Sequence, residues 1–386
     1  MKLKPILLII LCVLLLGEIA VLVLLPANRQ NPSGDSTLQE PSSATAPPTE
    51  PPTEPPTEPP TEPPTEPPTE PPTEAPTEPP VKHYTLSFAG DCTFGSTRKN
   101  WTNVHHFVQT IGENYDYPFD NVRQYFEQDD FTLINLEGPL TDSTSGASSK
   151  TFVFRGPTAY SQIMTGSSVD AVTLANNHAM DYGQEGYTST VNVLKEAGIT
   201  YVEKNSTAIH ITESGLIIGL YAGAFDMRAK DVEAGIRELR NCGAQIIICT
   251  FHWGNEGEFR PTASQEQIAR AAIDAGAHIV YGHHPHVLQR IEEYNDGYIF
   301  YSLGNFSFGG AALPKDYDTA LVQVEVIQED GQEPQLGELT IIPCSISSME
   351  NQNNFQPTPL EPGAVYNRVL SKLDGSYTGP NYKIDY

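Results

Sequence analysis

A long apolar stretch near the amino terminus differs from the pattern that follows it. Residues 6–25 are apolar with two exceptions, and about this length lets one helix cross the hydrocarbon of a bilayer. Lys2 and Lys4 precede the stretch, and positive charge on that side favours a cytoplasmic amino terminus. The small-residue cleavage pattern of a removable signal peptide does not follow. The pattern therefore predicts a single-pass anchor in residues 1–26, with the rest of the chain extracytoplasmic.

A proline-rich repeat comes next. The tetrapeptide Pro-Pro-Thr-Glu occurs seven times from Pro47 to Glu74, and one Ala-Pro-Thr-Glu copy follows. Proline fixes φ and removes the amide donor, so the repeat favours extended polyproline II over helix or sheet. We expect residues 27–81 to form a disordered stalk that holds the next domain away from the membrane. A ligand for a proline-recognising domain is the alternative interpretation.

Beyond the repeat, the apolar positions alternate between two periods. Short apolar runs predict strands at 84–89, 131–136, 171–174, 216–222, 246–251, 278–281 and 299–302. Helical spacing lies between them at 186–197, 231–241 and 264–275. This alternation predicts one α/β domain over 82–346, with helices covering a mostly parallel sheet. Residues 319–342 predict an antiparallel hairpin, and the polar residues 347–386 predict an irregular C-terminal extension.

The charge of the chain limits its partners. The net charge is −26; residues 1–80 contain three cationic and eleven acidic side chains, so they contribute −8 and the remainder contributes −18. Such an acidic domain argues against nucleic acid as a partner, because binding to phosphates depends on Lys and Arg. Four cysteines with irregular spacing lie beyond the anchor, and we expect them to be buried free thiols: Cys92, Cys242, Cys249 and Cys344.

Polar side chains of metal-ligand types follow most of the predicted strands. In chain order these residues are Asp91, Glu137, Asn176, Asn177, His178, His252, His283, His284 and His286. The fourth strand ends without such a residue. Sites in open α/β sheets form at the carboxyl ends of strands, so we expect these side chains to converge. Oxygen and imidazole ligands together suit Mn, Fe or Zn.

Each cluster also has a plain structural explanation when it is taken alone. Asp91 could belong to a turn, Glu137 could be a solvated strand end, and His252 with Glu256 could lie in a packed aromatic turn. Chance is a weaker explanation for three imidazoles within four residues, from His283 to His286. Five of the ten histidines fall in these strand-end clusters, which favours a shared site. The aromatic side chains of Phe306 and Phe308 are expected to pack at a strand-to-loop turn.

Six motifs together resemble the CapA-type poly-γ-glutamate capsule-synthesis family. They are GDCTFG at Gly90, NLEGPLT at Asn135, LANNHAMDYG at Leu174, HWGNE at His252, GHHPHVLQ at Gly282 and YSLGNFSFG at Tyr301. The resemblance runs in order from about residue 84 to 309. The family is similar in fold to the calcineurin-like metallophosphoesterases. The resemblance therefore implies a four-layer α/β/β/α sandwich.

The resemblance also implies roles for single residues. The implied ligands of one or two divalent metal ions are Asp91, Glu137, Asn177, His252, His284 and His286. His178 would be the general acid, and Asp181 would orient it. Further candidates are His283, Asn176, Glu256 and Asn305. Phosphoesterases with two metals usually have Asp-x-His after the first strand, where this chain has Asp91-Cys92-Thr93, so the number of ions is left open.

Three functions follow from these observations. The first is a metal-dependent hydrolase that acts on a cell-envelope phosphoester or on the amide of a capsule polymer. The second is a non-catalytic assembly or export factor, whose metal site binds a polyanion or a membrane synthase. The third is a wall adhesin displayed on a stalk.

Overall fold

The computed structural model describes residues 81–146, 149–381 and 383. The predicted anchor and all but the last residue of the predicted stalk lie outside these ranges. Among the described residues, no helix combines the length and the apolar character that a membrane span requires.

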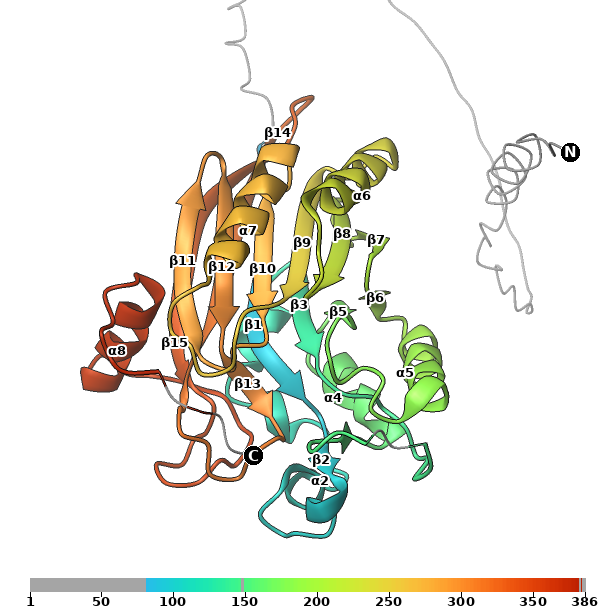
Figure 1. Cartoon of the computed structure of the whole chain (residues 1–386). Coiled ribbons are helices and arrows are strands. Elements are labelled where there is room, and N and C mark those ends of the chain that lie inside the picture. Colours follow the sequence, from blue (N-terminus) through green and yellow to red (C-terminus); the bar gives the residue numbers. More distant parts are fainter. Residues whose placement is uncertain (1–80, 147–148, 382, 384–386) are drawn as a thin grey trace, which may run out of the picture. The chain divides into compact units, whose positions relative to one another are not determined.

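Two mixed sheets form the centre of the domain (Figure 1). The first has the strand order β16-β15-β14-β1-β3-β5-β6, and β13 also pairs with β1. β1 runs parallel to β3 and antiparallel to β14, so long ladders hold it on both sides. The strands of this sheet are β1 (Val81–Thr93), β3 (Phe131–Leu136), β5 (Ala171–Thr173), β6 (Thr200–Val202), β13 (Asn305–Phe308), β14 (Asp318–Glu329), β15 (Gln335–Ser345) and β16 (Thr358–Pro359).

The second sheet has the order β11-β12-β10-β9-β8-β7. Its inner strands β8, β9, β10 and β12 are parallel, and its two edge strands are antiparallel. Its strands are β7 (Ser206–Ile211), β8 (Ile217–Ala224), β9 (Ile246–His252), β10 (Ile279–His283), β11 (Leu288–Tyr294) and β12 (Gly297–Leu303). A separate two-stranded pair joins β2 (Ser96–Thr97) to β4 (Phe154–Arg155).

The two sheets face each other across one apolar core. Leu86 and Leu133 of the first sheet are fully buried there together with Ile218 and Ile248 of the second. Complete burial of one such side chain contributes about 1.5–3 kcal/mol. Alternate residues of a strand point to opposite faces, and Ile134, the neighbour of Leu133, accordingly packs in a second core on the outer face of the first sheet.

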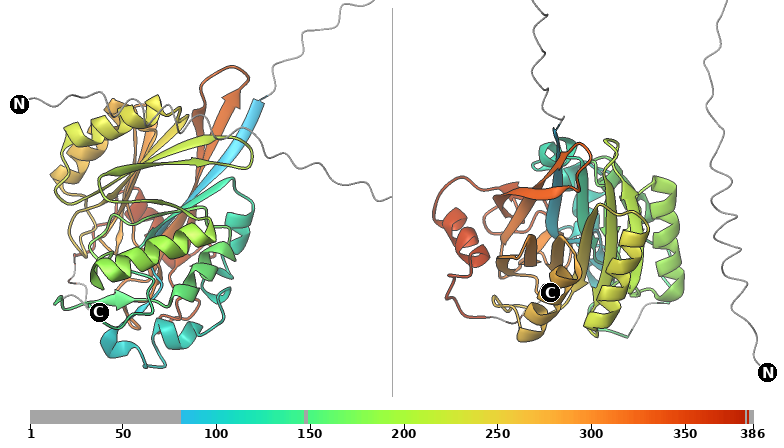
Figure 2. Two further views of the ribbon diagram at one scale, coloured as in Figure 1. Left: turned by 90° about the vertical axis from the view of Figure 1, so that its right-hand side faces the viewer. Right: turned by 90° about the horizontal axis from the view of Figure 1, so that it is seen from above.

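Helices cover the outer faces of both sheets and complete four layers (Figure 2). α6 (Ala229–Asn241) and α7 (Ala263–Ala275) pack on the second sheet, with Val232 and Ala269 buried against its strands. α5 (Gly183–Ala197) and the short α2 (Phe107–Ile111), α3 (Arg123–Glu127) and α4 (Ser161–Thr165) cover the first sheet. The expected α/β alternation is confirmed, and the two-sheet arrangement that the resemblance implied is present.

Two predictions about the domain need correction. Residues 347–386 are not irregular throughout, because they contain β16 and α8 (Ala364–Leu373). Val369 and Leu373 are one helical turn apart and bury one face of α8 in the shared core. The predicted antiparallel hairpin at 319–342 is confirmed by β14 and β15, which extend a sheet whose neighbouring strands β1, β3 and β5 are parallel. Cys242 is exposed, whereas the other three cysteines are buried free thiols as expected.

Candidate metal centre

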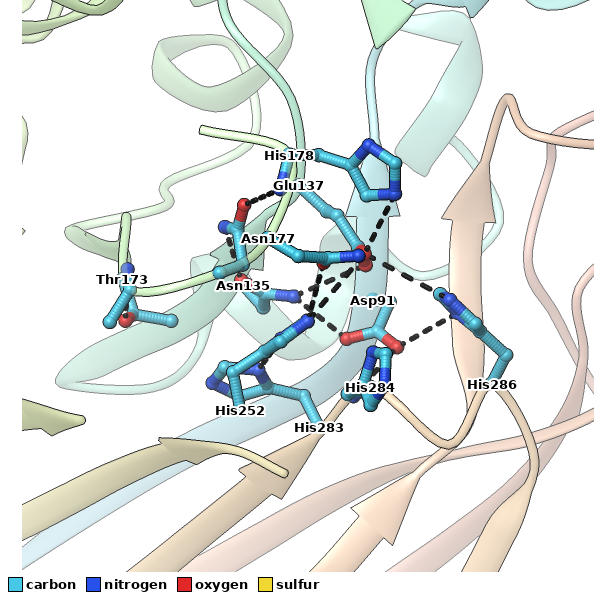
Figure 3. Close-up of polar contacts among 12 residues, drawn as sticks. Asp91, Asn135, Glu137, Thr173, Asn177, His178, His252, His283, His284 and His286 are labelled. Carbon is cyan, nitrogen blue, oxygen red and sulfur yellow. Dashed lines mark hydrogen bonds and ion pairs between the residues drawn. The ribbon is translucent and has the colours of Figure 1, made fainter. Parts of the chain in front are cut away.

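The predicted site residues from both sheets lie around one point at the carboxyl ends of the strands (Figure 3). Strand pairing explains part of this, because register aligns Asp91 of β1 with Asn135 of β3. It also aligns His252 of β9 with His283 of β10. Gly90 lets β1 approach its neighbour closely, since a Cβ there would lie 2.3 Å from the carbonyl oxygen of Gly304.

Asp91 is fully buried and held by three groups. Its Oδ1 accepts a hydrogen bond from Asn135 Nδ2 at 2.8 Å, and its Oδ2 accepts one from the amide of His284 at 3.3 Å and lies 3.2 Å from His286 Nδ1. Burial alone would raise the pKa of Asp91, but the hydrogen bond and the charge of His286 outweigh it and lower that pKa. Asp91 is therefore an ionised carboxylate at neutral pH.

Glu137 follows β3 directly and carries an oxygen without a conventional partner. Its Oε1 is buried and forms no hydrogen bond with any described residue. The same oxygen lies 3.9 Å from the Nε2 atoms of His252 and His286 and 4.0 Å from that of His178. These distances are too long for hydrogen bonds. They leave an oxygen and several imidazole nitrogens aimed at a common space.

His252 occupies the centre of a chain of side-chain contacts. Its Nε2 lies 2.7 Å from Asn177 Oδ1, and its Nδ1 lies 2.7 Å from His283 Nδ1. The other nitrogen of His283 lies 2.8 Å from Thr250 Oγ1. Both ring nitrogens of His283 are therefore engaged, one by His252 and one by Thr250.

The loop after β10 carries the remaining two imidazoles with an unusual backbone. His284 has φ 100° and His286 has φ 56°, in a region that non-glycine residues rarely adopt. Residues held in this way cluster at functional sites. His286 Nδ1 also lies 2.8 Å from Asn305 Oδ1, which orients its ring. His284 Nδ1 is buried and has no hydrogen-bond partner among the described residues.

His178 also lies near Glu137, and Asp181 orients its ring. His178 Nδ1 is 2.7 Å from Asp181 Oδ2, and that same oxygen accepts the amide of Phe154 at 2.8 Å. Lys150 Nζ lies 3.1 Å from Asp181 Oδ1 and donates to the backbone carbonyl of Asn177. Asp181 is fully buried, and these contacts hold its carboxylate in place. The carboxylate in turn orients the ring of His178.

Two predicted candidates remain, Asn176 and Glu256, and the site contains one residue that was not predicted. Asn176 turns away from the imidazoles, because its Nδ2 donates to Asn135 Oδ1 at 3.0 Å and to the carbonyl of Leu136 at 2.9 Å. Glu256 can bring a carboxylate oxygen within 4.8 Å of ligand atoms of His284 and His286. Asn135 was not among the predicted site residues, although it bonds to Asp91 and lies 3.4 Å from Glu137. Its place two residues before Glu137 on a buried strand is the signal that could have found it.

The donor set fits a divalent cation. Three overlapping groups have ligand atoms within 4.8 Å of one another: Asp91, Glu137 and His286; Glu137, His252 and His284; and Glu256, His284 and His286. Carboxylate and imidazole ligands in combination suit Mn, Fe or Zn. Buried polar atoms without partners carry a cost that a bound cation removes. Glu137 Oε1 and His284 Nδ1 are such atoms among the described residues.

At neutral pH some ligands of the site are ready to bind a metal, whereas Glu137 and His286 would have to release protons. Burial lowers the pKa of His284 to about 3 and that of His283 to about 4, so both are neutral. Burial would also lower the pKa of His286, but the charge of Glu137 and the hydrogen bond with Asp91 raise it to about 9. Burial raises the pKa of Glu137 well above its ordinary value. The charge of His286 opposes this rise, and the charges of nearby carboxylates add to it. A bound cation would lower the pKa values of Glu137 and His286 and release their protons.

His284 should make the metal-free protein sensitive to acid. Its folded-state pKa of about 3 lies below the ordinary value of 6.5, so its contribution to stability is present above pH 6.5 and is lost as the pH falls toward 3. Relative to His284→Gln, the wild type should lose about 1.4 kcal/mol of unfolding free energy per pH unit between pH 6 and 4. Denaturant unfolding with a chelator at pH 7, 6, 5 and 4 measures this difference. Parallel curves for the two proteins would contradict it.

Comparisons with known proteins identify the family of this chain. The family model described as "Bacterial capsule synthesis protein PGA_cap" matches residues 85–223 and 203–310. The chain is similar to the capsule biosynthesis protein CapA of Bacillus anthracis, with 29% identity over 327 residues, which cover 76% of this chain and 74% of that protein. It is also similar to the PGA biosynthesis protein CapA of Bacillus subtilis, with 30% identity over 265 residues, or 62% of this chain and 67% of that protein.

Among solved structures, the NAD nucleotidase of Haemophilus influenzae matches with a TM-score of 0.41 and 12% identity, over 76% of this chain and 56% of that one. The family model, by contrast, spans more than half of the residues and includes every candidate ligand, from Asp91 to Asn305. The chain belongs to the bacterial capsule synthesis protein family.

Proposed function

We propose that this chain is a metal-dependent hydrolase of the cell envelope that acts on a capsule polymer, with poly-γ-glutamate as the first candidate. The observation that carries the proposal is the position of Glu137 Oε1, buried without a hydrogen-bond partner in the described chain and about 4 Å from three imidazole nitrogens. Buried carboxylates are retained where they coordinate a metal or pair with charge. Clusters of ionisable groups with perturbed pKa values are typical of catalytic sites.

Two overlapping sets of residues would hold the cations. Asp91, Glu137 and His286 form one set, and Glu137, His252 and His284 form the other. Asn177 Oδ1 lies beside His252 Nε2 and adds an oxygen to the second set. Glu137 belongs to both sets and would therefore help to hold a cation in either. A divalent ion held here supplies Lewis acidity, which lowers the pKa of water and polarises the oxygen of the group under attack.

His178 would supply the proton to the leaving group. Its Nε2 lies 4.0 Å from Glu137 Oε1, at the edge of the ligand cluster, while its Nδ1 faces Asp181. A carboxylate on one ring nitrogen fixes the tautomer and direction of the other. Asp181 in turn is held by the Phe154 amide and by Lys150. These residues prepare a proton donor without themselves reaching the cations.

We further propose that the domain works outside the cell and is tethered to the membrane by residues 6–25. The apolar length of that segment and the preceding lysines support this arrangement. The acidic charge of the domain opposes contact with a polyanion, except where bound cations invert the local field. The metal centre is therefore the expected point of contact with an anionic polymer.

The full chain should bind divalent metal and hydrolyse substrate through the same residues. Wild type, Asp91→Ala and His178→Ala are to be compared, with His83→Ala as a matched control, because His83 is exposed at the start of β1. Metal content is measured directly, and turnover with Mn is assayed on γ-linked glutamate polymer and on a phosphodiester. We expect Asp91→Ala to lose metal and turnover, and His178→Ala to retain metal and lose most turnover. Turnover that survives the loss of metal would refute a metal-dependent hydrolase.

One observation favours a second candidate, a non-catalytic factor in polymer assembly or export. The relatives from Bacillus anthracis and Bacillus subtilis are named for biosynthesis rather than degradation. In this function the cations would hold the polyanion or a synthase partner. Metal binding by the wild type without turnover on either substrate would support it.

His283 is expected to strengthen metal binding without contacting the ion. It lies 2.7 Å from His252 Nδ1 and anchors that ring to Thr250. Loss of such a supporting contact typically costs about 10–100-fold in metal affinity. Titration of His283→Ala with Zn against a competing chelator measures the loss, and His83→Ala is the control. Wild-type affinity in His283→Ala would contradict this role.

A further inference from the structure

The fourth strand of the predicted series, β8, brings an aromatic ring to the site instead of a metal ligand. Phe225 follows the last residue of β8 directly, and 45% of it is exposed to solvent. By contrast, the aromatic side chains of Trp253, Phe306 and Phe308 near the site are buried and serve packing. Phe225 therefore offers an aromatic surface to a ligand at a place where those three rings do not.

The Phe225 ring lies directly against two of the candidate metal ligands. Its centroid is 5.0 Å from that of His284 and 5.5 Å from that of His252, with interplanar angles of 84° and 81°. Edge-to-face contacts of this kind are favourable between aromatic rings. One side of the ring thus packs on the imidazoles, while its remaining surface faces solvent beside the metal centre.

The backbone holds this ring in place at an energetic cost. Phe225 has φ 51°, a left-handed conformation that is an outlier for a bulky side chain. Its amide donates to the carbonyl of His252 at 3.0 Å, and its own carbonyl accepts the amide of Met227 at 2.8 Å. Strained residues held by their surroundings are typical of ligand-binding sites. An exposed aromatic ring held this way, next to the ligands, is better explained by contact with substrate than by packing.

We propose that Phe225 is a substrate-contacting residue that determines specificity. Its exposed ring contacts the aliphatic part of a polymer unit whose anionic group is held at the metal centre. A γ-linked glutamyl unit has this chemistry, since a short methylene chain lies next to a carboxylate. Inorganic phosphate has the anionic group alone. This inference rests on the metal centre of the proposed function, but not on hydrolysis.

Binding by the Mn-loaded full chain tests the inference, with calorimetry as the readout. The probes are an oligomer of γ-linked glutamate and inorganic phosphate. We expect Phe225→Ala to weaken binding of the oligomer about tenfold, the effect of losing contact with two methylene groups, and to change phosphate binding less than about twofold. Phe225→Tyr should retain oligomer binding. Where turnover is measurable, Phe225→Ala should raise KM and leave kcat unchanged.

Ile211→Ala is the matched control. Ile211 is 62% exposed and pairs with Ile217 at the start of β8, the end of that strand remote from the site. Equal weakening of both probes by Phe225→Ala, or loss of bound Mn, would show that the ring only supports the imidazoles and would overturn the proposal. So would a wild type that binds Mn and phosphate but not the oligomer. Oligomer binding without turnover would refute the hydrolase and leave this inference standing.

Discussion

Glu137→Gln is expected to lower metal affinity by more than about 100-fold while leaving the domain folded. Glu137 is the carboxylate that belongs to two of the three ligand groups, so its loss affects both. Glutamine has nearly the same shape but lacks the negative charge that a hard divalent cation requires. Metal content after dialysis, and affinity from competition with a chelating dye, measure the loss.

The same substitution should stabilise the metal-free protein. Burial raises the pKa of Glu137 well above its ordinary value of 4.5, so the contribution of this group to stability is present below pH 4.5 and is lost as the pH rises through the raised folded-state pKa. Glutamine has no such loss. With a chelator present, Glu137→Gln should therefore unfold at a temperature equal to or above that of the wild type at pH 7, and the gap should widen from pH 5 to pH 8.

Glu293→Gln provides the control, because Glu293 is an exposed residue of the edge strand β11. It should match the wild type in metal content and in thermal unfolding. Wild-type metal affinity in Glu137→Gln would show that Glu137 is no ligand. A metal-free Glu137→Gln protein less stable than the wild type would show that its charge serves the fold instead.

Lys372→Met is expected to destabilise the domain by about 3 kcal/mol or more. The ammonium group is nearly inaccessible, with a side chain 2% exposed, and it lies 2.8 Å from Asp316 and 2.7 Å from Asp318. The rings of Phe259 and Tyr377 lie beside the same ammonium, at 4.7 Å and 5.2 Å from their centroids. Removing one member of a buried ion pair leaves its partner's charge uncompensated, which costs about 3–5 kcal/mol. Unfolding by guanidinium chloride measures the change.

A second substitution separates lost charge pairing from lost packing. Burial and the charge of Asp318 already raise the pKa of Asp316, so Asp316 is the group left most unfavourably placed when Lys372 is removed. Lys372→Met combined with Asp316→Asn should therefore recover part of the lost stability. Lys230→Met, on the exposed first turn of α6, should change stability by less than about 0.5 kcal/mol. Equal stability of Lys372→Met and Lys230→Met would contradict the prediction.

Most of the predicted strands could be located from the sequence to within two residues at each end, although β1 is longer than the predicted 84–89. β3 has the predicted bounds, because all six of its residues are buried, including the polar Thr132 and Asn135. β7 was missed, since an edge strand with a half-exposed Ser-Thr-Ala-Ile-His-Ile sequence has neither an unbroken run nor a clear alternation. β13 was missed for another reason. Its parallel pairing with β1 joins Asp91 to Asn305, and such long-range pairing leaves no local pattern.

The composition of the site was more predictable than its arrangement. Strand ends bearing carboxylates and imidazoles could be expected to converge, because parallel strands place their carboxyl ends at one edge. The sequence could not decide among the three adjacent histidines of the β10 loop. That distinction depends on backbone φ at His284 and His286 and on the bond between His283 and His252. Phe225 was overlooked because an exposed aromatic residue after a strand has no chemical signature of its own.

The position of β1 has a mechanical consequence. Residues 1–80 join the domain at Val81, the first residue of β1, and the same strand reaches Asp91 near its other end. A pull on the amino end would act along the strand axis, while its ladder bonds to β14 and β3 run across that axis. Many ladder hydrogen bonds would therefore share the load in shear, and they would not be broken one after another. A domain tethered at Val81 could thus bear tension from a polymer held at its far end without losing the shape of its metal centre.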